Sequence, residues 1–510
     1  MATGNYRALY SSSLDRLFAV CGSGFYEIFS DKSWILRGHL HTVNGTVSIT
    51  ENETQLLIVD GTDGWIYNLL TNALTQIINY SDMVDTIAVT DGGMNYRVSD
   101  TVTLQTPAVG SPCTTTVYAV STDGTSSIAQ AGLTIVNRGR GYSMGDTSTS
   151  STYGTGAIVN VETLADGGFK SASHCITLDG FFICNEINTG RFFWSYLRDG
   201  LTWDPLDYAT AEGTPDNILS IGKVNNEIWL FGPRTTEVWF NTGSTDNQFQ
   251  RIQQGFIDIG IAAPWSNATL GDRIFWLGSN NAGYGIIYMA QNYLPKRIST
   301  HAIEYIIAQM SDISDAVGYC YQQEGHHYYV LSFTSGNRTV VYDVEANMWH
   351  ERSYWNSSAN KEERHRGQYG VFCFNKVFLA DYQNSNLYEL NLDTYTDNGS
   401  PIRRQRTGPH IRSDRKRLFH HQFEIDLERG VGLNSGQGSK PYISLTCSDD
   451  GGKTFGNERK LTIGSAGKNV TRAKATRLGY SRDRVYRLTI SEPVKIVLVG
   501  ARADIEPERE

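Results

Sequence analysis

The chain repeats a short apolar segment, a polar or glycine-containing turn, and a second segment rich in aromatic residues. Arg16–Cys21 is followed in this way by Phe25–Phe29, and Leu56–Val59 by Trp65–Leu69. Two short apolar runs joined by such a turn predict a β-hairpin. Helical periodicity is scarce, and the best candidate helix is His301–Met310. We therefore expect an all-β fold.

The hairpins recur about every 40–50 residues outside one long gap, which is the spacing of four-stranded propeller blades. About seven such units precede residue 400, and six is the lower alternative. A β-sandwich or several small β domains is the competing interpretation. We predict a β-propeller formed by residues 1–81 and 168–400.

Two regions depart from this repeat. Residues 82–167 are dominated by Thr, Ser, Gly, Ala and Val, and the segment that begins at Gly93 is repeated at Gly139, with Gly, Tyr, Asp and Thr at matching positions. We predict an inserted small β domain with an internal duplication, which a loop between blade strands can accept because its ends lie close together. The pattern changes again after Gly399, and residues 401–510 predict a separate antiparallel β domain.

Charge is distributed unevenly along the chain. The net charge is −9, but residues 401–510 hold 22 Lys and Arg against 13 Asp and Glu, a net +9, and the first 400 residues hold 22 against 40, a net −18. An acidic body with a basic tail indicates two surfaces with different partners. Seven scattered cysteines without CxxC spacing favour reduced thiols in a cytoplasm over a disulfide framework. No apolar run is long enough to predict a membrane span.

A strongly basic segment opens the C-terminal domain. One interpretation is a solvated linker or an interface with an acidic neighbouring subunit, and the other is contact with phosphates. We favour the interface, because attraction between the acidic residues 1–400 and the basic residues 401–510 of neighbouring subunits explains the uneven charge without contact with DNA. The residues in question are Arg403, Arg404, Arg406, Arg412, Arg415, Lys416 and Arg417.

A second motif in this domain fits the Asp-box pattern, Ser-x-Asp-x-Gly-x-Thr-aromatic. It predicts a tight turn in which Asp accepts backbone N–H bonds and Gly takes positive φ. Asp boxes occur in sialidases, but sialidase chemistry also needs an arginine cluster and a Tyr nucleophile with a Glu partner. No local pattern supplies these groups, so we expect a structural turn and no catalytic residues. The box consists of Ser448, Asp450, Gly452, Thr454 and Phe455, and Arg198–Trp203 is a partial second copy.

Three pairs of histidines are candidate metal ligands. None has a Glu or Cys partner at a ligand spacing such as HExxH, so we expect no metal site and no cofactor. A distant residue could still complete a site with the first pair. The pairs are His39 and His41, His326 and His327, and His420 and His421.

Several stretches resemble the tail hub proteins of short-tailed phages (podoviruses), also called packaged-DNA stabilisation or tail nozzle proteins. The most specific is Leu230–Gly243, LFGPRTTEVWFNTG. Each stretch alone is weak, but their order along residues 1–80 and 168–510 makes the resemblance specific, whereas the insert departs from it. The others are Trp276–Gly278, Lys296–Thr300, Val341–Asp343, Trp349–Arg352, Tyr395–Gly399, Ser448–Phe455, Arg477–Gly479, Ile490–Ser491 and Val499–Ala501.

The resemblance implies a structural virion protein without catalytic residues. It implies a homo-hexamer in the virion tail, present in the host cytoplasm before assembly, that continues the DNA channel below the portal-adaptor ring. Its partners would be that ring, tailspikes or tail fibres, a tail needle or plug, and packaged DNA in transient, non-specific contact. The alternatives are a sialidase-like propeller glycosidase and a glycan-binding adhesin.

Overall fold

The structure is a computed structural model in which the chain divides into two compact units. The first consists of Met1–Arg352 and Arg364–Glu389, and the second of Ser353–Glu363 and Leu390–Glu510. The second unit therefore includes residues 390–400, which we had assigned to the propeller. The residues described are 4–78, 83–107, 112–165, 167–211, 213–245, 247–280, 283–414 and 416–508.

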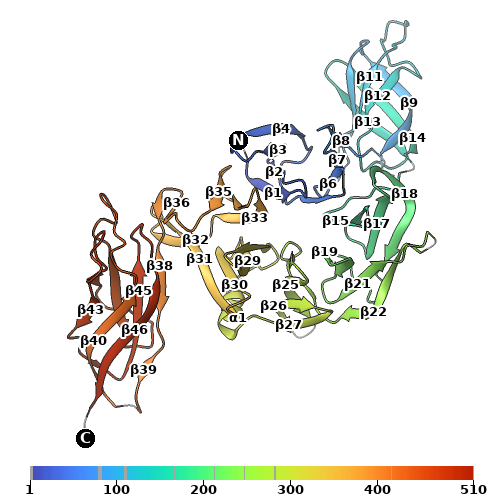
Figure 1. Ribbon diagram of the computed structural model, residues 1–510. Coiled ribbons are helices and arrows are strands. Elements are labelled where there is room, and N and C mark those ends of the chain that lie inside the picture. The colour runs from blue at the N-terminus through green and yellow to red at the C-terminus, as the bar shows by residue number, and fades with distance from the viewer. Residues whose placement is uncertain are drawn as a thin grey trace. The chain divides into compact units, whose positions relative to one another are not determined.

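Seven small antiparallel sheets follow one another round a ring in the first unit (Figure 1). Most keep the order of the sequence, as successive hairpins dictate. This arrangement confirms the predicted β-propeller, with seven sheets among the described residues. The first four are β1 (Tyr6–Ser11), β2 (Leu17–Cys21), β3 (Gly24–Ile28) and β4 (Trp34–His39); β5 (Ser48–Glu51), β6 (Gln55–Val59), β7 (Gly64–Asn68) and β8 (Leu74–Gln76); β15 (Cys175–Leu178), β16 (Phe181–Asn185), β17 (Arg191–Tyr196) and β18 (Asp199–Thr210); and β19 (Ser220–Val224), β20 (Glu227–Phe231), β21 (Thr236–Asn241) and β22 (Phe249–Ile257).

The last three sheets have five, five and three strands, and the part of the sixth sheet within residues 353–363 is assigned to the second unit. The helix α1 (His301–Ala308) lies between the fifth and sixth in sequence and buries Ile303 and Ile307, as its apolar face predicts. The strands are β23 (Gly260–Ile261), β24 (Ala268–Leu270), β25 (Arg273–Asn280), β26 (Gly283–Gln291) and β27 (Leu294–Arg297); β28 (Val317–Gln323), β29 (His326–Phe333), β30 (Arg338–Asp343), β31 (Met348–Asn356) and β32 (Lys361–Arg364); and β33 (Gly367–Cys373), β34 (Lys376–Asp381) and β35 (Leu387–Leu390).

The core of the first unit consists of apolar clusters between neighbouring sheets. One cluster joins the last sheet to the first, with Phe378 packed among Leu17, Tyr26 and Ile28. The backbone N–H of Phe374 also donates to Asp15 Oδ1 at 2.8 Å. No strand is shared between these two sheets among the described residues. The ring is therefore closed by side-chain packing and local hydrogen bonds.

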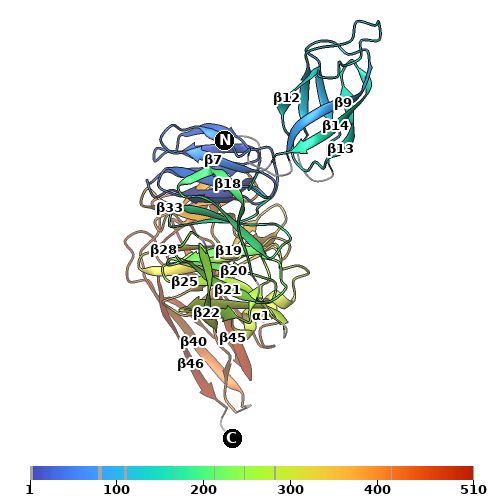
Figure 2. The same cartoon turned by 90° about the vertical axis from the view of Figure 1, so that its right-hand side faces the viewer.

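The insert forms one six-stranded sheet whose order reveals the duplication. The first strand of each copy pairs with the last strand of the other copy, because β9 pairs with β14 and β12 with β11. Figure 2 shows β9 beside β14. The two copies thus exchange strands about the central β10–β13 pair. In sheet order the strands are β12 (Leu133–Asn137), β11 (Thr114–Val117), β10 (Thr101–Leu104), β13 (Gly145–Ser151), β14 (Thr155–Leu164) and β9 (Val84–Met94).

The glycine that opens the repeated motif has the same φ in both copies. Gly93 and Gly139 each have φ +60°, and a Cβ at either position would lie 2.4–2.5 Å from backbone atoms. The tyrosine that follows each glycine is buried, Tyr96 at 2% exposure and Tyr142 at 8%. The Tyr142 hydroxyl accepts a hydrogen bond from the backbone N–H of Cys113 at 2.9 Å. Glycine is required here because only it adopts this conformation without a clash.

The C-terminal unit is a two-sheet sandwich around one apolar core that includes Ile425, Ile443 and Tyr486. A two-stranded sheet, β36 (Thr396–Asp397) and β37 (Ser400–Pro401), precedes it. The first sheet contains β38 (Arg404–Thr407), β39 (Ile411–Arg412), β45 (Asp483–Ile490), β41 (Tyr442–Ser448) and β42 (Arg459–Thr462), and the second contains β43 (Ala473–Thr476), β40 (Leu418–Leu427), β44 (Tyr480–Ser481) and β46 (Leu498–Pro507).

None of the seven cysteines, all of which the structure describes, forms a disulfide. Within the described residues, no helix is long and apolar enough to cross a bilayer.

Candidate interface on the C-terminal domain

The basic segment lies in a sandwich sheet. β38 pairs with β45, placing Arg404 opposite Ile490, and β39 pairs with the same strand, placing Arg412 opposite Asp483. Successive side chains of a strand point to opposite faces, so Arg404 and Arg406 share one face of β38, whereas the other basic residues lie on different segments. The seven basic residues therefore do not form one uniform surface.

Two of the arginines stabilise the second unit itself. The Arg403 guanidinium lies 4.8 Å from the centre of the Trp355 ring and donates to Glu362 Oε1 at 2.9 Å. Arg404 donates to the backbone carbonyls at positions 492 and 494, at 2.7 and 3.1 Å. Burial lowers the pKa of Arg404 from its ordinary value. Both side chains have structural contacts that a docking partner would have to replace.

The end of the segment is also partly engaged. The Arg417 guanidinium lies 5.3 Å from the centre of the Tyr480 ring and 4.0 Å from Glu508 Oε1. Lys416 is exposed. Arg415 lies outside the described residues.

Arg406 and Arg412 are the two remaining members. Both are exposed, and neither side chain has a hydrogen bond or ion pair with the described part of the chain. Their charges therefore face solvent in the isolated protein. This makes them the best candidates for contact with a partner.

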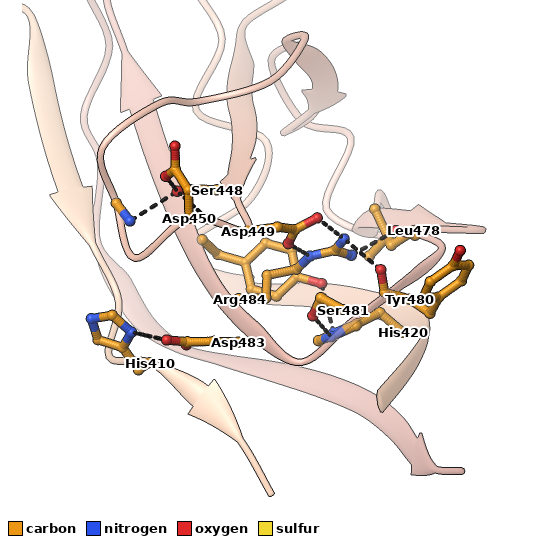
Figure 3. Close-up of polar contacts among 12 residues, drawn as sticks. His410, His420, Ser448, Asp449, Asp450, Leu478, Tyr480, Ser481, Asp483 and Arg484 are labelled. Carbon is orange, nitrogen blue, oxygen red and sulfur yellow. Dashed lines mark hydrogen bonds and ion pairs between the residues drawn. The ribbon is translucent and has the colours of Figure 1, made fainter. Parts of the chain in front are cut away.

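The Asp-box residues form the turn that joins β41 to β42 (Figure 3). Asp450 Oδ1 accepts the backbone N–H groups of Lys453 and Thr454, both at 2.9 Å. Ser448 Oγ donates to the same oxygen at 2.6 Å and accepts the N–H of Gly452 at 2.9 Å. Hydrogen bonds from Ser448 and Thr454 lower the pKa of Asp450 well below its usual range. The carboxylate is thus saturated with structural hydrogen bonds.

The aromatic residue of the box has a cation partner. The Arg487 guanidinium lies 3.4 Å from the centre of the Phe455 ring, a cation–π contact. The partial copy, Arg198–Trp203, begins at the turn between β17 and β18 and continues along β18. Its Trp203 is buried and donates to Gly200 O at 2.8 Å. The complete box therefore belongs to the sandwich and the partial box to the propeller.

A buried arginine connects the box to residues 478–481, which include a strand of the other sheet of the sandwich. Arg484 on β45 binds both carboxylate oxygens of Asp449, at 2.6 and 2.7 Å, and donates to Leu478 O at 2.6 Å (Figure 3). Burial lowers the pKa of Arg484, but the hydrogen bonds to Asp449 outweigh that effect and the net pKa lies above its ordinary value. The network fixes the start of the turn relative to residues 478–481.

His420 is buried beside this network, and its contacts place it among the structural residues. Its Nε2 lies 2.9 Å from Ser481 Oγ, and its Nδ1 lies 3.0 Å from the Tyr486 hydroxyl. Burial, with a smaller contribution from the charge of Arg484, lowers the pKa of His420 to about 4. The imidazole is therefore neutral at pH 7, which suits Nε2–H donating to Ser481 while Tyr486 donates to Nδ1.

We expect His420→Gln to reduce the loss of stability in acid. The folded pKa lies below the ordinary value of 6.5, so the unfolded chain binds the extra proton between these values. Stability therefore falls as pH falls from 6.5 towards 4, by about 1–2 kcal/mol between pH 7 and pH 5 for this residue. His174, His350 and His365 also have lowered pKa values, so the test compares urea unfolding of variant and wild type at both pH values. His421→Gln, at the exposed neighbouring position, should lose as much stability between pH 7 and pH 5 as wild type does. An equal loss in all three proteins would contradict the predicted contribution of His420.

Comparison with known proteins identifies both units. A family model described as bacteriophage P22 Gp10, beta-propeller, matches residues 83–395, and one described as bacteriophage P22 Gp10, beta-sandwich, matches residues 403–506. The first match includes the insert, which we had expected to depart from the family, and does not include residues 1–82. No curated protein matches the sequence.

Among solved structures, Kluyveromyces lactis Hsv2 is similar at 8% identity, with 69% of this chain and 98% of that chain covered and a TM-score of 0.26. A TM-score this low does not establish a shared fold. The two family matches together span most of the chain and confirm the resemblance found in the sequence. The chain belongs to the P22 Gp10 family and is a structural tail hub protein of a short-tailed phage.

Proposed function

We propose that six copies of this chain form the ring that continues the DNA channel below the portal adaptor. The ring helps to retain packaged DNA and offers docking surfaces for tailspikes or fibres and for a needle or plug. The observation that carries the proposal is the match of both the propeller and the sandwich to one tail family.

In this proposal the chain has no catalytic role. The polar groups that the sequence offered for chemistry have structural contacts instead. Asp450 is saturated by its own turn, Arg404 binds backbone carbonyls, and His420 is buried. Such contacts suit a protein that supplies rigid surfaces.

Arg406 and Arg412 are the groups through which the sandwich contacts an acidic neighbouring subunit. A ring of identical copies needs heterologous interfaces, in which one surface meets a different one. The net charges of +9 for residues 401–510 and −18 for the first 400 favour such a contact. Arg403 and Arg404 are unsuitable for a test, because their loss would disturb the second unit.

The test replaces Arg406 and Arg412 together by Gln and measures hub copies per particle by mass. Wild-type tails should contain six copies, and the variant should be incorporated several-fold less, because the interface loses its charge complementarity. Arg472→Gln is the control, since this arginine is exposed and pairs with Glu424 on the same chain. Normal incorporation with leakage of DNA would show instead that the two arginines face DNA, and a copy number other than six would refute the hexamer.

A further inference from the structure

A cluster of metal-binding side chains lies at one end of the sixth propeller sheet. β29 begins with His326 and His327, β30 ends at Asp343, and the turn after β30 contains Glu345. His326 Nδ1 lies 2.8 Å from Asp343 Oδ2, and His327 Nδ1 lies 2.5 Å from Glu345 Oε1. One ligand atom each from His326, Asp343 and Glu345 lies within 4.8 Å of the other two.

The two carboxylates of this cluster lack a permanent cation. Their ion-pair partners are the two histidines, and no Lys or Arg forms an ion pair with either acid in the described part of the chain. Adjacent carboxylates repel each other unless a positive charge lies between them. Asp343 and Glu345 together therefore form a local negative charge that a divalent cation would neutralise.

The donor atoms indicate which cation. One imidazole nitrogen with two carboxylate oxygens suits Zn²⁺ and its neighbours in the first transition row rather than Ca²⁺ or Mg²⁺. Ligand atoms about 2.0–2.2 Å from a tetrahedral zinc lie about 3.4 Å apart. His326 is 46% exposed and Glu345 36%, so both side chains have room to rotate and close the remaining distance.

We propose that His326, Asp343 and Glu345 bind one divalent transition-metal ion of the Zn²⁺ class. His327 lies outside the coordination sphere and holds Glu345 in position through the hydrogen bond between its Nδ1 and Glu345 Oε1. Two further hydrogen bonds hold the acids in place: the N–H of Ala346 donates to Asp343 Oδ1 at 3.0 Å, and the N–H of His327 to Glu345 Oε2 at 2.6 Å. The ion ties the start of β29 to the turn that follows β30 and stabilises this sheet by mass action.

The test measures saturable binding of Co²⁺, a coloured substitute for Zn²⁺, to the full-length, untagged protein after chelation. Wild type should develop the visible absorption of bound Co²⁺ at one ion per chain, and Zn²⁺ should displace it. His326→Ala and Glu345→Gln should each weaken the affinity at least about tenfold. Glu345→Gln is nearly isosteric, so it tests the ligand even if the alanine variant is unstable.

The chain contains a matched control. His410 Nδ1 lies 2.9 Å from both oxygens of Asp483, and its side chain is 49% exposed. It thus forms a similar His–carboxylate pair, without a third ligand among the described residues. His410→Ala should bind Co²⁺ as wild type does. Absence of saturable binding by wild type would overturn the proposal, as would equal affinities of the His326, Glu345 and His410 variants.

Discussion

Replacing Arg484 by Ala is expected to destabilise the C-terminal sandwich by about 3 kcal/mol. The side chain is 4% exposed, and its removal leaves the carbonyl of Leu478 without its charged donor. It also removes the bidentate contact that fixes Asp449 at the start of the Asp-box turn. Hydrogen exchange should therefore accelerate in β41 and β45 of the variant, while exchange in the first unit stays unchanged.

The control for this prediction is Arg472→Ala. Arg472 also binds a carboxylate through two nitrogens, on Glu424, but its side chain is 56% exposed. An exposed ion pair contributes about 0–1 kcal/mol, so this variant should exchange almost as wild type. Equal effects of the two substitutions would show that the burial of Arg484 contributes nothing.

Replacing Phe378 by Ala is expected to open the contact between the last and first propeller sheets. Phe378 is 4% exposed in the cluster that joins them, and its loss should cost about 3–5 kcal/mol. Because these sheets share no strand among the described residues, side-chain packing provides most of the stabilisation of the contact between them. Exchange should accelerate in β1–β3 and β33–β34 together, before it does so in the sheets opposite.

Phe372→Ala provides the matched comparison in the same sheet. Its side chain is 55% exposed, so the substitution removes the same atoms without forming a cavity. We expect a change within about 0.5 kcal/mol. If Phe378→Ala accelerated exchange in β33–β34 but not in β1–β3, closure would depend on something other than this cluster.

The repeat of hairpins predicted the propeller because each blade is a local structure. The expected pair Arg16–Cys21 and Phe25–Phe29 corresponds to β2 and β3, and the expected helix His301–Met310 to α1. Two neighbouring strands and the turn between them are specified by some fifteen consecutive residues, which pattern analysis can detect.

Contacts between distant residues were beyond such analysis. A run of arginines does not show that Arg404 binds backbone carbonyls while Arg406, two residues later on the same strand, faces solvent, because that depends on the distant residues that lie beside each one. His326 and His327 have no carboxylate partner at a recognised sequence spacing. Their partners, Asp343 and Glu345, are brought to them only by the pairing of β29 with β30. The residue types are visible in the sequence, but the contacts that each one makes with distant residues are not.

The packing that closes the propeller also sets an order of events during synthesis. Asp15 and Phe374, which join the first and last sheets, are separated by 359 positions. At about 5–20 residues per second, a ribosome needs about 20–70 s to make the later partner after the earlier one. The apolar face of the first sheet, which includes Leu17 and Tyr26, has no permanent cover during this interval. Protection of the nascent first blade is therefore a requirement that this ring places on the host cell.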